Sequence, residues 1–224
     1  MTQHAKMPVV VLISGGGSNL QALIDGAVDG YLPIELRAVV SNEPDAFGLQ
    51  RASAAGIETR ILSHRQFDGR EVYDQALMEL IDGFSPGLVV LAGFMRILTP
   101  AFVDHYRGRL LNIHPSLLPR FRGLHTHQRV LESGDLEHGA SVHFVTEELD
   151  GGPLVLQVRV PIQTDDDDDA LAARVLKHEH RIYPQVVRWF AEGRLRMAES
   201  GDLILDDGVL AGPVVWTSDL PETD

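Results

Sequence analysis

The sequence predicts an α/β fold, a doubly wound and mostly parallel twisted sheet flanked by helices. Apolar runs of strand length alternate along the chain with segments whose apolar residues recur at helical spacing. Several of these runs contain no polar residue, as expected for strands that helices cover on both faces of a parallel sheet. The 224 residues are 44% hydrophobic, enough to bury one substantial core, so we expect a single domain over residues 1–224.

A Gly-rich turn joins the first expected strand to the first expected helix. The strand is expected at residues 9–13, which read Val-Val-Val-Leu-Ile, after a short disordered lead at residues 1–7. Residues 14–19, Ser-Gly-Gly-Gly-Ser-Asn, follow at once, and the apolar residues from 20 to 27 recur at helical spacing. The glycines therefore lie on a strand-to-helix turn.

The alternation continues through the rest of the chain. Further strands are expected at residues 36–40, 59–62, 88–92, 109–113, 141–145 and 154–160. Helices are expected at residues 47–55, 67–81 and 170–192. Residues 195–224 are expected to form a small C-terminal extension that starts with a hairpin over residues 195–209. The strands at 88–92 and 109–113 end in polar, Gly or Pro residues, and α/β sheets build their sites at such strand ends.

Composition excludes several classes of function. The formal net charge of −13 repels the phosphates of DNA and RNA, so no nucleic-acid partner is expected. Without cysteines, the chain has no disulfides, thiolate metal sites or cysteine nucleophiles. The N-terminal residues lack the apolar core of a signal peptide, and no stretch approaches the ~20 apolar residues of a membrane span. We therefore expect a cytoplasmic protein with no membrane partner.

Asn112, His114 and Pro115 stand together at the end of the strand expected at 109–113. Alternate residues of a strand share a face, so Asn112 and His114 point the same way. Pro115 holds His114 in an extended conformation and cannot continue the strand. The pattern presents an amide beside an imidazole, although by itself it also fits two core polar groups with backbone partners.

Other polar patterns have an ordinary structural explanation beside a functional one. Residues 149–152, Leu-Asp-Gly-Gly, fit an Asp-Gly turn between strands. The acidic run at 165–169 fits a solvated helix start better than a cation site. His178 and His180 are two residues apart on an expected helix, so they face different ways and make a poor metal pair.

The Gly-rich turn allows several interpretations. It lacks the lysine of a Walker loop, and Leu20 interrupts the spacing of a dinucleotide-binding Gly-x-Gly-x-x-Gly motif. A tight turn with no ligand remains open. So does a turn that holds one phosphate on the backbone N–H groups at the start of a helix.

Residues 112–123, Asn-Ile-His-Pro-Ser-Leu-Leu-Pro-Arg-Phe-Arg-Gly, resemble the signature of the folate-dependent formyltransferases. Further segments match in the family's order, at residues 14–21, 91–98, 123–127 and 148–153. The first of these resembles the phosphate loop of the family's purine-pathway branch. The resemblance spans roughly residues 8–195 and implies a single Rossmann-like formyltransferase domain. It implies transfer of a formyl group from 10-formyltetrahydrofolate, a co-substrate, to the amine of a small phosphoribosyl substrate, without a metal.

The resemblance also implies three catalytic residues. Asn112 would donate a hydrogen bond to the oxyanion that forms during transfer. His114 would stabilise that charge as a cation or relay a proton, and Asp150 would favour the charged imidazole.

Binding residues follow from the same resemblance. The substrate phosphate would be held by Gly17, Ser18 and Asn19, and the sugar or amine end by Glu179. The folate would contact Arg70, Met95, Arg96, Ile97, Leu98 and Asn112, with residues 146–149 completing the pteridine pocket. Without the resemblance, Met95, Ile97 and Leu98 would be interpreted as core and Arg70 as a surface ion-pair partner. His125 and His127 line the site, pack at a helix start or lie exposed to solvent, and the sequence leaves these alternatives open.

Two positions depart from the family's pattern. The family often has Asn where this chain has Gly16, a change that affects the flexibility of the turn more than its chemistry. It often has Gln where this chain has Leu176, which removes an expected phosphate contact that Lys177 could replace.

Rival functions are open on the sequence alone. A formyltransferase acting on methionyl-tRNA would need a further domain and a basic surface, and a sugar-nucleotide formyltransferase would also need a further domain. A hydrolase of formyl folate is a third rival. A non-catalytic folate- or nucleotide-binding module is a fourth, and it is disfavoured if Asn112, His114 and Asp150 converge. The expected partners are small molecules, and a homodimer is allowed.

Overall fold

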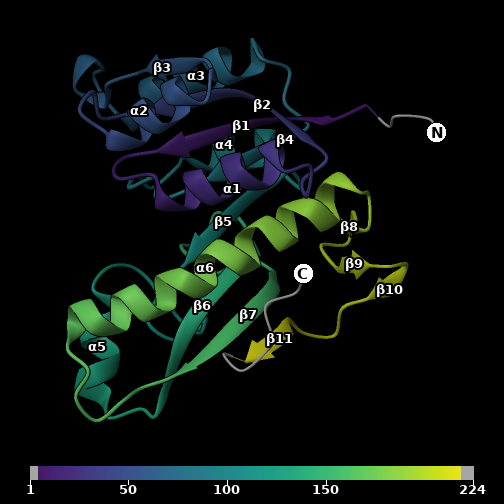
Figure 1. The fold of residues 1–224 in the computed structure, drawn as a ribbon. Coiled ribbons are helices and arrows are strands. Elements are labelled where there is room, and N and C mark those ends of the chain that lie inside the picture. The colour runs from purple at the N-terminus through teal and green to yellow at the C-terminus, as the bar shows by residue number, and fades with distance from the viewer. Residues whose placement is uncertain (1–4, 218–224) are drawn as a thin grey trace.

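The computed structural model describes residues 5–217, and its centre is an eight-stranded sheet in the order β11-β7-β6-β5-β4-β1-β2-β3 (Figure 1). The strands of this sheet are β1 (Met7–Ile13), β2 (Ile34–Ser41), β3 (Thr59–Ile61), β4 (Leu88–Leu91), β5 (Leu110–His114), β6 (Glu137–Phe144), β7 (Leu154–Pro161) and β11 (Val214–Thr217). Neighbouring strands run parallel except for the pairs β5–β6 and β6–β7, which are antiparallel. The predicted α/β fold with a mostly parallel sheet is confirmed.

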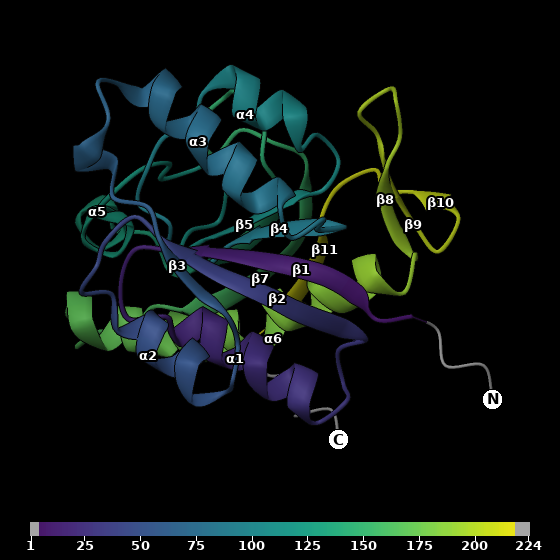
Figure 2. The ribbon, with the colours of Figure 1, turned by 90° about the horizontal axis from the view of Figure 1, so that it is seen from above.

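Helices cover both faces of this sheet (Figure 2). They are α1 (Ser18–Val28), α2 (Phe47–Ala54), the 3-10 helix η1 (His64–Gln66), α3 (Arg70–Asp82), α4 (Pro100–His105), α5 (Thr126–Ser133) and α6 (Asp168–Ala191). In Figure 2, α3 and α4 lie on one side of the strands, while α1, α2 and α6 lie on the other. The sheet is therefore the middle layer of three.

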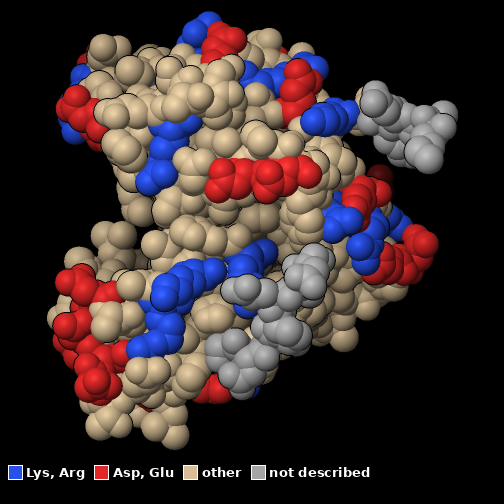
Figure 3. All heavy atoms as spheres, viewed as in Figure 1, with Lys and Arg blue, Asp and Glu red and all other residues tan. Residues whose placement is uncertain are grey.

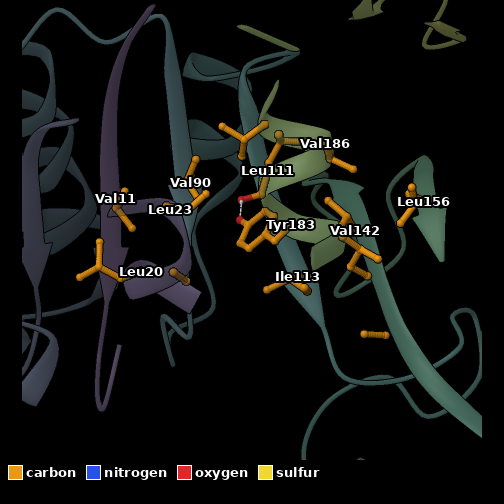
Figure 4. Packing of buried hydrophobic residues seen from close by; sticks show 14 of the residues in the cluster. Val11, Leu20, Leu23, Val90, Leu111, Ile113, Val142, Leu156, Tyr183 and Val186 are labelled. Carbon is orange, nitrogen blue, oxygen red and sulfur yellow. Dashed lines mark hydrogen bonds between the residues drawn. The ribbon is translucent and has the colours of Figure 1, made fainter. Parts of the chain in front are cut away.

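The unbroken apolar run of β1 serves both faces. Val9, Val11 and Ile13 join the core cluster formed with α1 and α6, whereas Val10 and Leu12 join the cluster formed with α3 and α4. This alternation is the two-residue period of a strand, and all five side chains are fully buried. The first cluster is shown in Figure 4.

Tyr183 of α6 ties two central strands together inside this core. Its hydroxyl lies 3.0 Å from the Leu111 carbonyl oxygen of β5 (Figure 4). It also lies 2.8 Å from the Leu91 carbonyl oxygen of β4. One proton is shared between two acceptors, and burial raises the pKa of the Tyr183 phenol well above its ordinary value.

The boundaries differ from the sequence-based expectations at a few elements. Strand β6 begins at Glu137, four residues before the expected 141. The early start was not expected because the first residues of β6 have low strand propensity. Its Gly139 is required there, because an added Cβ would lie 1.8 Å from the Val158 carbonyl oxygen of β7. The helices α4 and α5 were not expected. Helix α4 has only six residues, and the two apolar residues of α5, Val130 and Leu131, are adjacent and show no helical spacing.

The ends of the described chain also differ from expectation. Met7, placed in the expected lead, pairs with Ile34 as the first residue of β1, and residues 1–4 of that lead lie outside the described residues. The expected C-terminal hairpin is a three-stranded sheet of β8 (Leu195–Met197), β9 (Leu203–Leu205) and β10 (Gly208–Val209). Strand β11 then joins the main sheet parallel to β7, while residues 218–224 are not described.

The strand order reverses beside β1, and this reversal places the site. The chain runs from β1 outward to β2 and β3, then returns to lay β4 on the other side of β1. In open α/β sheets such a reversal leaves a crevice at the carboxyl ends of the two strands. The Gly-rich turn follows β1 there, and residues 93–99 follow β4. Within residues 5–217, no helix combines the length and apolar character needed to cross a membrane.

Candidate active site

Strand β5 presents Asn112 and His114 at its carboxyl end, on the face that Leu110 shares with α3 and α4. The intervening Ile113 points into the opposite core cluster. Antiparallel pairing with β6 sets His143 directly opposite Asn112. The sheet thus places three polar side chains at one strand end.

Asp150 reaches this strand end from the loop between β6 and β7. Its backbone has a φ of 49°, in the left-handed region. One carboxylate oxygen, Oδ2, accepts the Gly123 N–H at 2.9 Å and lies 3.5 Å from His114 Nδ1. The other, Oδ1, lies 3.9 Å from His143 Nε2. The structure brings the expected trio of Asn112, His114 and Asp150 together.

Both ring nitrogens of His114 face oxygen acceptors. Nε2 lies 3.0 Å from the Phe121 carbonyl oxygen, which can only accept, so Nε2 donates. Nδ1 faces the Asp150 carboxylate at 3.5 Å. A neutral imidazole has one donor and would leave one of these contacts without a proton, whereas an imidazolium satisfies both. Asp150 is therefore the side chain placed to balance a positive charge on this ring.

His143, by contrast, is held neutral. Its Nδ1 donates to the Phe144 carbonyl oxygen at 2.9 Å, and its Nε2 lies 3.3 Å from Asn112 Nδ2. Burial lowers the pKa of His143, and the nearby Asp150 raises it less. The bare Nε2 accepts a hydrogen bond from the Asn112 amide, which orients the NH₂ group of that amide and leaves its second N–H for a ligand.

His143 was not among the residues expected at the site. A signal was available, because Ser141 and His143 alternate with apolar residues in a segment expected to be a strand. Only the pairing of β6 with β5 shows that this polar face meets Asn112.

Two neighbouring cavities open beside the trio. The larger, of about 550 Å³, is lined by Asn112, His114 and Asp150 and, from the segment after β4, by residues 93–97. The smaller, of about 100 Å³, is lined by residues 96–98 and 145–150 and shares Asn112 and Asp150 with the larger. The expected folate residues Met95, Arg96, Ile97, Leu98 and Asn112, together with residues 146–149, all line one cavity or both.

Arg70 and Arg96 behave differently from each other. Arg70, the first residue of α3, is exposed and lines neither cavity. Arg96 lines both, and its guanidinium carbon lies 4.7 Å from the centre of the Tyr73 ring. Its Nε atom is buried with no hydrogen-bond partner among the described residues.

The Gly-rich turn caps α1 with Gly17. Its φ of 68° is left-handed, and an added Cβ would lie 2.7 Å from the Gly48 Cα of α2. No side chain caps the start of α1, so Ser18 and Asn19 present backbone N–H groups at the positive end of the helix. Gly16 meets nothing within 4 Å, so the family's Asn would fit at this position.

Asn19 and Glu179, two of the expected substrate residues, touch each other. Asn19 Nδ2 donates to Glu179 Oε2 at 2.7 Å, and both residues are buried where α1 packs on α6. Burial raises the pKa of Glu179, and the hydrogen bond from Asn19 lowers it by less. Asn19 Oδ1 has no partner among the described residues.

The remaining candidates separate into cavity and helix-start residues. His125 and His127 line the large cavity, and burial lowers the pKa of His127. In the acidic run, Asp167 accepts the Ala170 N–H as the N-cap of α6, and Asp166 pairs with Arg174. The run thus forms a helix start, as expected. Residues 5–217 contain no group of three or more His, Cys, Asp or Glu side chains placed to hold a metal ion.

The sequence and the structure of this chain are similar to those of known proteins of one family. The family model described as formyl transferase matches residues 7–187. The chain belongs to the formyl transferase family. It is 57% identical over 213 residues to a phosphoribosylglycinamide formyltransferase of Escherichia coli, covering 95% of this chain and 100% of the relative. A Haemophilus influenzae protein of the same name is 46% identical over 192 residues, which are 86% of this chain and 91% of that relative.

Solved structures of formyl transferases have the same fold as this chain. The phosphoribosylglycinamide formyltransferase of Coxiella burnetii superposes with a TM-score of 0.89 at 51% identity, over 94% of this chain and 99% of that one. The glycinamide ribonucleotide transformylase 1 of Symbiobacterium toebii gives a TM-score of 0.86 at 40% identity, over 92% and 95%. The family resemblance inferred from residues 112–123 is confirmed.

Proposed function

We propose that this chain transfers a formyl group from 10-formyltetrahydrofolate to the amine of 5′-phosphoribosylglycinamide. The products are formylglycinamide ribonucleotide and tetrahydrofolate, in purine biosynthesis. The observation that carries the proposal is the convergence of Asn112, His114 and Asp150 on one wall of a 550 Å³ cavity, next to a Gly-rich turn. Relatives that bear the name of this activity cover nearly the whole chain.

Asn112 stabilises the transition state in this proposal. The substrate amine attacks the formyl carbon, and the formyl oxygen gains negative charge as the tetrahedral intermediate forms. The free N–H of the Asn112 amide donates to that oxygen, a contribution of roughly 2.7–4 kcal/mol in comparable sites. His143 holds the amide in the orientation that makes this possible.

His114 and Asp150 manage charge and protons. The net reaction moves one proton from the attacking amine to the departing folate nitrogen, so acid and base must both be present. As an imidazolium, His114 stabilises the oxyanion by its charge, because its two ring nitrogens face the Phe121 carbonyl oxygen and Asp150. Asp150, 3.5 Å from His114 Nδ1, balances that cation and can take up the amine proton through water. The proton that Asp150 takes from the amine passes on through water to the folate nitrogen.

The ribonucleotide binds across α1 and α6. Its phosphate rests on the backbone N–H groups of Gly17, Ser18 and Asn19 and on the Ser18 hydroxyl. Glu179 receives its sugar or its glycinamide end. The net charge of −13 does not oppose this locally, because Lys and Arg side chains gather along α6 on the face shown in Figure 3. Lys177, next to the apolar Leu176, is one of the basic residues of α6.

The folate lies along the two cavities. The pteridine enters the smaller one, between residues 96–98 and 146–149, so that its formyl nitrogen sits near Asn112 and Asp150. Arg70, exposed at the start of α3, meets the acidic tail outside the cavities.

The wider setting follows from the same proposal. The whole chain acts as one formyltransferase domain whose partners are small molecules, with neither nucleic acid nor membrane involved. A cytoplasmic location agrees with a substrate made and used in metabolism, and a homodimer is compatible with it.

Steady-state transfer tests the proposal. The assay follows the absorbance of the deformylated folate with phosphoribosylglycinamide as acceptor, beside a His114→Ala variant and a reaction without acceptor. Activity that needs both His114 and the acceptor is expected. Turnover of the folate without an acceptor would indicate a hydrolase, and no turnover at all would leave a binding protein.

A further inference from the structure

Ser14 opens the Gly-rich turn, yet its side chain binds a different segment. Its Oγ accepts the Met95 N–H at 2.8 Å, and its backbone N–H donates to the Gly93 carbonyl oxygen at 3.1 Å. Both partners lie in residues 93–99, which we call the strap, and the strap lines both cavities. The contacts of Ser14 therefore hold the strap and not a ligand of the turn.

The direction of the Ser14 hydroxyl is fixed by Asn42. Asn42 Nδ2 faces Glu43 Oε1 and His64 Nδ1, each at 3.4 Å. A carboxylate only accepts, so the NH₂ group lies on that side and Asn42 Oδ1 faces Ser14 Oγ at 2.5 Å. The single hydroxyl proton of Ser14 goes to Asn42, which leaves the lone pairs of Oγ for the Met95 N–H. Asn42 is 2% exposed and cannot turn freely.

A buried carboxylate anchors the other end of the strap. The Thr99 N–H donates to Asp74 Oδ2 at 2.6 Å, and Asp74 is 1% exposed. Between the two anchors, Met95 and Ile97 are 68% and 58% exposed and both line the large cavity. These two side chains have little core packing of their own, whereas Phe94 and Leu98 of the strap pack on the core cluster of α3 and α4. The position of the Met95 backbone therefore depends on its hydrogen bond to Ser14 more than on packing.

We propose that Ser14 is a positioning residue for the folate donor. Through the Met95 N–H it sets how far the strap stands from Asn112 and Asp150, and hence the width of the folate cavity. Ser14 belongs by sequence to the phosphate turn, but it acts on the other substrate. The inference rests on the proposed function, because it assigns the strap cavities to the folate.

Titration calorimetry with each ligand separately tests this division. For Ser14→Ala, the Kd of tetrahydrofolate rises about five- to tenfold, the effect of losing one hydrogen bond, while the Kd of phosphoribosylglycinamide changes less than about twofold. In steady state, the KM for the formyl folate rises and kcat changes little. Ser14→Thr keeps the hydroxyl and restores folate affinity. The matched control Ser18→Ala has the opposite signature, weaker ribonucleotide binding with unchanged folate binding.

Other results would overturn the inference. A Ser14→Ala variant that loses ribonucleotide affinity alone would return Ser14 to the phosphate site, and equal losses for both ligands with a lower Tm would reveal a merely structural role. If Ser14→Ala does not fold, Ser14→Cys replaces it, since sulfur is a weaker acceptor and predicts an intermediate loss of folate affinity. Wild-type protein that binds neither ligand would refute the proposed function, whereas binding unaffected by any Ser14 variant refutes only this inference.

Discussion

His143 Nε2 and Asn112 Nδ2 lie 3.3 Å apart across the antiparallel pair β5–β6, with the imidazole as acceptor and the amide as donor. A neighbouring strand therefore orients the amide that we propose to bind the oxyanion. Its orientation does not depend on a substrate.

Replacing His143 should reduce the rate of transfer more than substrate binding. His143→Leu removes the acceptor, so Asn112 can turn its carbonyl oxygen toward the developing negative charge. We expect kcat to fall about tenfold or more, with the KM for the ribonucleotide within about twofold, in steady-state assays. Thermal unfolding of the same variant provides the control for misfolding. A kcat like that of the wild type would show that Asn112 keeps its orientation without His143.

Asp150→Asn should nearly abolish transfer. The amide can still accept the Gly123 N–H, but it carries no charge to balance the His114 imidazolium and cannot take up a proton. We expect a loss of about 100-fold or more in kcat and a changed pH–rate profile. Asp165→Asn, an exposed residue that lines neither cavity, is the matched control. An unchanged rate and pH profile for Asp150→Asn would remove Asp150 from the mechanism.

Replacement by alanine should be harmful at Gly17 and nearly neutral at Gly16, although both glycines belong to the same turn. Gly17→Ala forces a side chain into a left-handed conformation and against Gly48, so we expect a loss of more than about 1 kcal/mol of stability and weaker ribonucleotide binding. Gly16→Ala meets open space and should leave both nearly unchanged. Thermal unfolding and ribonucleotide titration measure the two effects. Equal behaviour of the variants would mean that the turn is not held against α2 as described.

The free energy of unfolding should decrease as the pH falls, in part because His138 is buried. Burial lowers the pKa of His138 from 6.5 to about 4. Above pH 6.5 the imidazole is neutral in both states, whereas between pH 6.5 and 4 the unfolded chain binds a proton that the folded chain resists. His138 thus contributes a loss of up to about 2 kcal/mol at about pH 5. His138→Asn should flatten the dependence of unfolding free energy on pH, measured by urea titration at about pH 7 and about pH 5, whatever its effect at neutral pH. The same slope in both proteins would refute the prediction.

Local sequence patterns predict the fold of the central strands well. The unbroken apolar run of β1 and the spacing in α1 and α6 agree with the structure to within two residues, because burial on one face or both imposes those patterns. Helix α3 begins three residues after the expected position, since Phe67 packs on the core although it precedes the helix. Strand β11 was not expected, because its four residues carry little periodicity.

The site was predictable only in part, for a related reason. The shared face of Asn112 and His114 follows from strand geometry, whereas the role of Asp150 came from the resemblance alone. The contact of Asn19 with Glu179 joins residues far apart in the chain, so no local sequence pattern predicts it. The same holds for His143 and Ser14, whose partners are decided by how strands pair and where the strap crosses.

Glu179 and Tyr183 stand one helical turn apart on α6. The Tyr183 hydroxyl donates hydrogen bonds to the carbonyl oxygens of Leu91 and Leu111. Leu91 lies two residues before the strap, and Leu111 directly precedes Asn112. A single helical turn of about 5.4 Å thus sets the distance between the carboxylate proposed to receive the ribonucleotide and the strands that carry the proposed formyl-transfer groups. In the proposed reaction, the pitch of this helix therefore aligns the formyl acceptor with the formyl donor, and a shift of α6 along its axis would separate them.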